Sequence, residues 1–241
     1  MRRTAQRILC RHLVVSDKGD DGGVALSETQ IATIRPTAFH AFWPGIGIDL
    51  TSATRNYWDL SRAHLRYGRF GGARFIGYTN FSKTTFTRYV EFSNARFSLR
   101  AEFQGATIAG SAWFGGATFE GEANFAQASF GDHIWFSHAT FNDRANFRSA
   151  KFAGDPWFGG PDAIFSNAEF DGATFIGAAI FDQAEFASGA EFRGARAASQ
   201  AERSDVWPEG WRTVPSSESA WLLVTRADPD REPVAEPKAT R

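Results

Sequence analysis

Residues 112–130 read AWFGGATFEGEANFAQASF, and this stretch holds the pattern that decides the fold. Phenylalanine stands at positions 114, 119, 125 and 130, so the steps between rings are five, six and five residues. The residue two places before a ring is small, as at Ala117 and Ala123. In an extended chain, residues i and i−2 face the same way, so each Ala-x-Phe triplet directs two apolar side chains to one side.

The same spacing continues in both directions and covers more than half of the chain. It holds 22 Phe and one Ile, with one irregular step between Asp155 and Phe165. The positions are 70, 75, 81, 86, 92, 97, 103, 108, 114, 119, 125, 130, 136, 141, 147, 152, 158, 165, 170, 175, 181, 186 and 192.

An eleven-residue period is also compatible with a right-handed supercoiled helix. Residues 70–197 contain 16 Gly, however, and each costs about 1 kcal/mol relative to Ala inside a helix. The helix is therefore excluded. Four short strands, joined by corners of two or three residues, return the chain above its start after 22 residues, which predicts a square solenoid with parallel strands and a right-handed coil.

The first coil precedes Phe70 and is built of five-residue units, such as Ile48-Asp49-Leu50 and Trp58-Asp59-Leu60. Arg55 occupies an inward position of this coil, which conflicts with burial of the charge. Either its side chain reaches out at the open end, or it pairs with Asp49 or Asp59.

The Ala-(Asp/Asn)-(Leu/Phe)-x-x units over residues 46–197 resemble the pentapeptide-repeat proteins. The alternating spacing and flanks such as Val206-Trp207-Pro208 resemble an actinobacterial branch of that family. The resemblance implies an all-β solenoid, a right-handed quadrilateral parallel β-helix, and says almost nothing about function. Some members imitate DNA and bind DNA gyrase, so a DNA-mimicking modulator of gyrase or topoisomerase is the alternative function that the resemblance implies.

The two ends of a solenoid need covers. We expect an N-terminal helix and linker or cap at residues 1–45, with the helix at 4–15 and a loop at 16–30. The β-helix follows at 46–197, then an irregular C-terminal cap at 198–226 and a disordered tail at 227–241. The capping residues are expected to be Trp207, Trp211, Trp221, Leu222 and Leu223.

One outward position repeats as tryptophan at intervals of 22 residues, which places Trp113, Trp135 and Trp157 above one another, with Ile180 next. A column of this kind in solvent is an exposed apolar patch and indicates a contact surface for a protein partner or a second copy. Alternatively, the chain's own termini cover it.

A second outward position reads Asn80, Glu102, Asn124, Asn146, Glu169, Glu191, so Glu102, Glu169 and Glu191 form a candidate acidic ladder. Residues 101–197 carry 12 acidic and 5 basic side chains, whereas residues 70–100 carry 1 acidic and 5 basic side chains. The acidic half could imitate a phosphate backbone, or could simply be a solvated surface.

Composition and motifs exclude several other classes. The 26 basic and 27 acidic side chains give a net charge of −1, which argues against direct nucleic-acid binding. Cys10 has no partner for an internal disulfide, and no stretch approaches the roughly 18 apolar residues of a membrane span. No apolar signal core follows Met1-Arg2-Arg3, so we expect a cytoplasmic protein.

No catalytic arrangement is recognisable either. His133 and His138 lie near acidic residues but lack the spacing of a zinc site, and Ser111 does not stand in a Gly-x-Ser-x-Gly elbow. We therefore expect a non-enzymatic protein without catalytic residues, metal or cofactor, which acts as a protein-protein interaction scaffold through its exposed faces.

Overall fold

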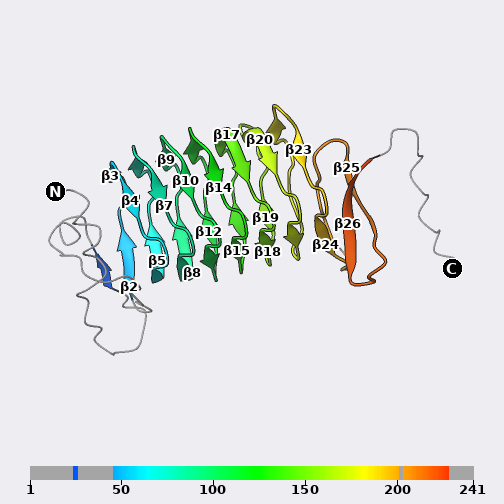
Figure 1. Cartoon of the computed structure of the whole chain (residues 1–241), viewed down its shortest axis with the longest axis horizontal. Coiled ribbons are helices and arrows are strands. Elements are labelled where there is room, and N and C mark those ends of the chain that lie inside the picture. Colours follow the sequence, from blue (N-terminus) through cyan, green and yellow to red (C-terminus); the bar gives the residue numbers. More distant parts are fainter. Residues whose placement is uncertain (1–23, 27–45, 201–202, 228–241) are drawn as a thin grey trace.

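A computed structural model describes residues 24–26, 46–200 and 203–227 of the chain. They form an all-β solenoid in which the strands of successive coils lie side by side along one long axis (Figure 1). Parallel strands pair at the predicted interval, for example Ala101 with Ala123 and Thr107 with Ser129, which confirms the predicted fold class. The predicted helix at 4–15 lies outside the described residues, and the described residues contain no helix.

The coil has four faces, grouped in two large sheets. Faces 1 and 2 belong to a 14-stranded sheet, because β5 (His64–Arg69) and β8 (Thr85–Glu91) each run across both faces. Face 1 continues with β11 (Thr107–Ile108), β15 (Ser129–Phe130), β18 (Lys151–Phe152), β21 (Thr174–Phe175) and β24 (Arg196–Ala198). Face 2 begins with β2 (Ile46–Asp49) and continues with β12 (Ala112–Trp113), β16 (Ile134–Trp135) and β19 (Pro156–Trp157).

Faces 3 and 4 belong to a 12-stranded sheet, joined through β17 (Thr140–Asn146) and β20 (Ile164–Glu169). Face 3 also contains β3 (Thr54–Arg55), β6 (Arg74–Phe75), β9 (Arg96–Phe97), β13 (Thr118–Phe119) and β22 (Glu185–Phe186). Face 4 also contains β4 (Trp58–Asp59), β7 (Thr79–Asn80), β10 (Ala101–Glu102), β14 (Ala123–Asn124) and β23 (Ala190–Glu191).

Two kinds of corner alternate and account for the five- and six-residue steps. At the tight corner after Phe92, the Ala95 amide donates to the Phe92 carbonyl at 2.9 Å and Asn94 has a φ of 58°, as in a type II turn. The wide corner after Ile108 has one residue more. There a Cβ on Gly110 would lie 2.0 Å from the carbonyl oxygen of Arg88, so the coils approach too closely for any other residue.

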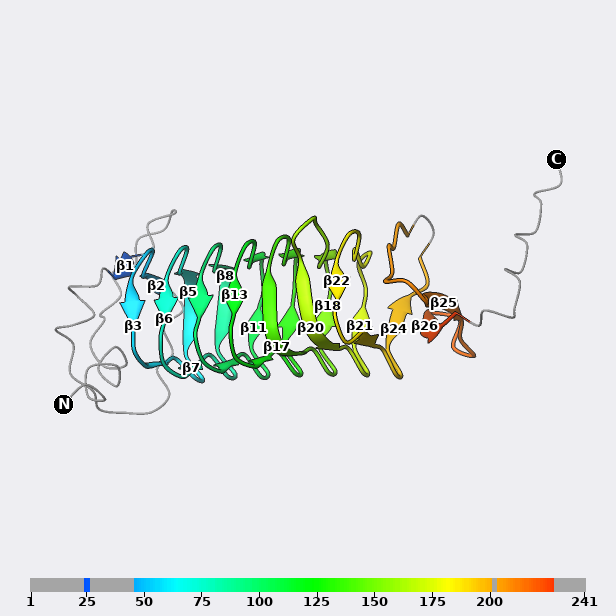
Figure 2. The same cartoon turned by 90° about the horizontal axis from the view of Figure 1, so that it is seen from above.

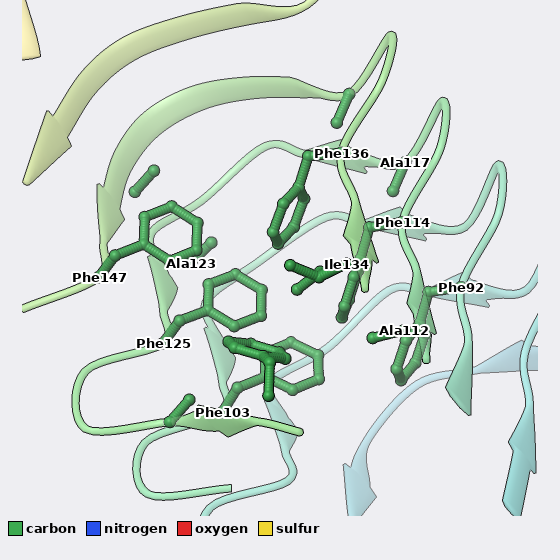
Figure 3. Close-up of a cluster of buried hydrophobic side chains, with 14 of the residues drawn as sticks. Phe92, Phe103, Ala112, Phe114, Ala117, Ala123, Phe125, Ile134, Phe136 and Phe147 are labelled. Carbon is green, nitrogen blue, oxygen red and sulfur yellow. The ribbon is translucent and has the colours of Figure 1, made fainter. Parts of the chain in front are cut away.

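The interior is filled by stacked columns of phenylalanine (Figure 3). Phe114 lies on Phe92 at 5.0 Å between ring centroids and on Phe136 at 4.9 Å, with nearly parallel planes. Adjacent columns meet edge to face, as Phe103 meets Phe114 at 5.6 Å and 86°. Offset stacking and edge-to-face contact are the two favourable arrangements of aromatic rings, so the repeat satisfies both at once.

The N-terminal end of the stack is closed by residues that replace the repeat pattern. Trp58, which is only 1% exposed, occupies the position that Thr79 takes in the next coil. Arg55 is half-buried; its guanidinium lies 5.9 Å from the centroid of the Trp58 ring and it donates to the Thr54 carbonyl at 3.1 Å. The strand β1 (Val24–Leu26) pairs with β2, so the prediction of a loop over residues 16–30 is wrong at these three residues. Three residues are too few to show a strand period.

The C-terminal cap is more regular than the irregular segment predicted. The strands β25 (Trp211–Pro215) and β26 (Trp221–Arg226) form an antiparallel hairpin, and β26 pairs with β24 (Figure 2). Trp211 and Leu222 pack on the core, as expected of capping residues. Leu223 is 41% exposed, so the prediction that it covers the core is wrong, because neighbouring strand residues face opposite sides. Trp221 lies under the guanidinium of Arg196 at 4.3 Å.

Candidate partner-binding faces

Face 2 carries the predicted column of tryptophan side chains. Trp113 pairs in register with Trp135, and Trp135 with Trp157. Ile180 follows beside Trp157, and Val206 follows beside Ile180. We call Trp113, Trp135, Trp157, Ile180 and Val206 the tryptophan stripe. Sequence reasoning missed Val206, because it stands 26 residues after Ile180 and outside the repeat period.

The rings of the tryptophan stripe are not equally exposed. Trp113 and Trp135 are half-buried and stack with centroids 5.6 Å apart and planes at 2°. Trp157 lies outside this stack and is 44% exposed. The stack therefore presents ring edges to solvent, whereas Trp157 presents the most open aromatic surface of the stripe.

Two tyrosines extend the aromatic surface toward the N-terminus. The Tyr89 ring meets Trp113 edge to face at 5.7 Å, and Tyr67 stacks on Tyr89 at 5.3 Å. Arg69 holds this pair, since its Nε donates to the Tyr89 hydroxyl at 3.0 Å. Burial raises the pKa of the Tyr67 phenol above its ordinary value. Neither tyrosine was predicted, because both stand two residues before the position of the tryptophan column in their own coils.

Face 4 carries the second predicted column. Glu102 pairs in register with Asn124, Asn146 follows Asn124, and Glu169 and Glu191 complete the column. Glu102 is buried, and Oε2 of its carboxylate accepts a hydrogen bond of 2.9 Å from Nδ2 of Asn124. The three predicted glutamates thus share one face, but with amide side chains between Glu102 and Glu169.

Arginine side chains neutralise this face. An unbroken chain of ion pairs alternates between acid and base along it, with five carboxylates and five guanidinium groups. In order, the chain is Glu102, Arg100, Glu122, Arg144, Glu169, Arg148, Asp171, Arg193, Glu191 and Arg226. Near its middle, Arg144 and Glu122 are 2.6 Å apart. We call these ten residues the ion-pair chain; its formal charge is zero.

These repeats match a known family. A family model described as pentapeptide repeats (9 copies) matches residues 60–107, 103–151 and 161–202, which is more than half of the chain. The chain belongs to the pentapeptide-repeat family. Neither a curated protein nor a solved structure matches it.

On this pentapeptide-repeat solenoid, one polar cluster beside the tryptophan stripe contains serine, histidine and aspartate. The Ser111 hydroxyl donates to Oδ2 of Asp132 at 2.8 Å, and this hydrogen bond lowers the pKa of the Asp132 carboxyl. His133 Nδ1 accepts from the Asp155 amide at 3.2 Å. The serine proton is therefore directed at a carboxylate, and one imidazole nitrogen is engaged by the backbone, so the cluster lacks the serine-to-histidine contact of a nucleophile.

The cap of the pentapeptide-repeat solenoid contains a buried clamp that sequence reasoning missed. Arg203 forms two hydrogen bonds with Asp205, at 2.7 and 2.6 Å, and both side chains are less than 10% exposed. Arg203 also donates to the carbonyls of Ile176 and Gly177, at 2.9 and 2.8 Å. Asp205 accepts from the Ala179 amide at 2.7 Å. The clamp thus satisfies backbone groups of the last coil that a further coil would otherwise bond.

Trp207 completes the cap from the inside. Its ring contacts Phe175, Phe181 and Phe192 at 5.2, 5.8 and 5.6 Å between centroids, and so closes three of the columns. A cavity of about 570 Å³ lies within the C-terminal cap. The residues that line it include Arg203, Asp205, Trp207, Arg212 and Leu222. It does not include any residue of the tryptophan stripe.

Metal ligands do not gather anywhere in the described ranges. Within residues 24–26, 46–200 and 203–227, no group of three or more His, Cys, Asp or Glu side chains is placed to hold a metal ion. The same part of the chain contains no helix that is long and apolar enough to cross a membrane.

Proposed function

We propose that this pentapeptide-repeat protein is a non-enzymatic scaffold that binds another protein surface through face 2. The observation that carries the proposal is the register of Trp113, Trp135 and Trp157 in consecutive coils, with Trp157 44% exposed. Large aromatic side chains clustered on a rigid surface are the residues that dominate the energy of protein interfaces. The parallel sheet beneath them is hydrogen-bonded from coil to coil, so little ordering is needed on binding.

The geometry of the rings supports a protein partner over a nucleic acid or a sugar. Nucleobases bind by stacking on an open aromatic face. The planes of Trp113 and Trp135 are parallel with centroids 5.6 Å apart, so their facing sides partly cover one another. Trp157, which is 44% exposed, leaves one open ring rather than a row of them. Such a surface suits contact with apolar protein side chains.

Catalysis receives no support from the polar groups next to this surface. Ser111 donates to Asp132, and His133 Nδ1 accepts from a backbone amide. An acid, a base and a nucleophile do not converge on one point in this cluster.

The alternative, a DNA-mimicking modulator of gyrase or topoisomerase, is weakened by the ion-pair chain. A DNA mimic needs a row of unneutralised negative charges. On face 4 the five carboxylates alternate with five arginines, so the row of charge predicted from Glu102, Glu169 and Glu191 is compensated. In a gyrase supercoiling assay we therefore expect neither inhibition nor protection of the enzyme. Inhibition at stoichiometric concentrations would favour the alternative.

Photo-crosslinking tests the proposed function even while the partner is unidentified. The photoreactive residue p-benzoylphenylalanine replaces Trp157 in one variant and Leu99 in a control, since Leu99 is 55% exposed and lies away from face 2. Both variants are irradiated at equal concentration in an extract of the source organism. We expect a discrete protein adduct from position 157 only. Equal adducts from both positions, or none from position 157, would refute the proposal.

A further inference from the structure

Charge is separated along the solenoid axis. Residues 46–100 contain nine basic and three acidic side chains, whereas residues 101–197 contain five and twelve. The N-terminal coils therefore carry a net charge of +6 and the later coils −7. Because the ion-pair chain on face 4 is itself neutral, most of this separation resides on the other faces and corners.

The edge of face 2 shows this separation next to the tryptophan stripe. Arg88 is exposed at the wide corner that leads into face 2, and the backbone of Gly110 packs on Arg88 in the next coil. Asp132 stands at the same corner two coils after Arg88, and Asp155 follows beside His133. Their side chains are 49% and 47% exposed. One edge of the tryptophan stripe thus changes from basic to acidic within a few coils.

We infer that the partner of face 2 is a second copy of this chain, packed face to face and antiparallel about a two-fold axis perpendicular to the solenoid. This inference rests on the proposed function. A two-fold interface must be complementary to itself, because the same surface is used by both copies. Antiparallel packing places Arg88 of one copy against the acidic edge at Asp132 and Asp155 of the other. Parallel packing would instead place the basic coils of one copy, residues 46–100, against the basic coils of the other.

The apolar part of the surface fits the same arrangement. The tryptophan stripe spans five consecutive strand positions, or roughly 20 Å at the usual spacing of strands. When Arg88 of one copy faces Asp155 of the other, the two-fold axis passes between Trp113 and Trp135, and the exposed Trp157 ring of each copy faces the coil of Tyr89, next to Trp113. There the stacked rings offer edges and a half-buried surface. The exposed apolar area and the edge charges are thereby covered together.

Analytical ultracentrifugation of the purified full chain tests this inference. We expect a dimer whose dissociation constant rises with sodium chloride, since rim charges are screened by salt. Trp157→Ser should raise the dissociation constant by more than about tenfold, as expected for an interface anchor. The control Leu99→Ser removes an exposed apolar side chain outside face 2 and should leave the dissociation constant unchanged.

Charge reversal tests the antiparallel arrangement. Arg88→Glu and Asp132→Arg should each raise the dissociation constant by about tenfold, because each change acts twice across a two-fold axis. The double variant should bring the constant back toward the wild-type value. The matched control is Arg74→Glu, which reverses the charge of an exposed residue on face 3. Circular dichroism melts verify that every variant is folded.

The possible results separate this inference from the proposed function. A protein that stays monomeric at all concentrations, or a dimer that ignores Trp157→Ser and Arg88→Glu, overturns the second copy as partner. In that case an adduct between position 157 and a different protein still supports the proposed function. A monomer without any adduct from position 157 refutes both.

Discussion

The ring of Trp113 lies on the ring of Trp135 with 5.6 Å between centroids and 2° between planes, although 22 residues separate them. Their strands pair directly, so the contact follows from the length of one coil. A double-mutant cycle with Trp113→Ala and Trp135→Ala, measured by urea unfolding, should give a favourable coupling of about 0.5–1.5 kcal/mol, the usual value for aromatic pairs. A coupling near zero would mean that the rings do not stack in solution.

At the wide corner of Gly110 the close approach of the preceding coil should tolerate only glycine. At Gly110 an added Cβ would lie 2.0 Å from the Arg88 carbonyl oxygen, so Gly110→Ala forces two coils apart. We expect a loss of about 2–3 kcal/mol in the free energy of unfolding. At Gly115 the nearest atom to an added Cβ is the Ser137 carbonyl oxygen at 3.6 Å, and Gly115→Ala should change stability by less than about 0.5 kcal/mol. Equal losses of stability at the two positions would contradict the close approach of the two coils at Gly110.

The Arg203–Asp205 clamp should hold the last coil in place. Arg203→Ala leaves Asp205 buried without its partner and frees the carbonyls of Ile176 and Gly177. The expected cost is about 3–5 kcal/mol, as for other broken buried pairs. Faster hydrogen exchange should appear first at the Ala179 amide, which donates to Asp205. Arg193→Ala is the control; its side chain is 74% exposed, and we expect a loss of less than about 1 kcal/mol.

The hydrogen bond from the Ser111 hydroxyl should lower the pKa of the Asp132 carboxyl. Because the folded-state pKa is lowered, the resulting stabilisation is present above the unfolded pKa and is lost as the pH falls through the folded one. Ser111→Ala should move the pKa of Asp132 upward, toward its ordinary value. Carbon-13 NMR of the carboxyl groups measures this shift. An unchanged titration would show that the hydrogen bond is absent in solution.

Periodicity explains what could be predicted and what could not. The columns of Phe and the register of Trp113, Trp135 and Trp157 depend only on the number of residues per coil, which can be counted in the sequence. Arg100, Glu122 and Arg144 stand at intervals of 22 residues, so this part of the ion-pair chain could have been found by the same count. The contacts of Arg144 and Arg148 with Glu169 could not, because they depend on the reach of long side chains, which the spacing does not specify.

The structure of the C-terminal cap could not be predicted from the repeat period. Arg203 and Asp205 act on backbone groups that are open only because no further coil follows. The sequence around them has no period. It therefore predicts an irregular segment where the structure has the hairpin of β25 and β26. The greater exposure of Trp157 than of Trp135 could not be predicted either, because the spacing places both in the same column.

Hydroxyl-radical footprinting tests most directly whether face 2 is a binding surface. Purified protein at high dilution is compared with the same protein in extract or at high concentration, and oxidation is measured at Trp157 and at Leu99 by mass spectrometry. We predict that Trp157 becomes protected on association while Leu99 keeps its reactivity. Protection of Leu99 with unchanged oxidation of Trp157 would contradict a binding role for face 2.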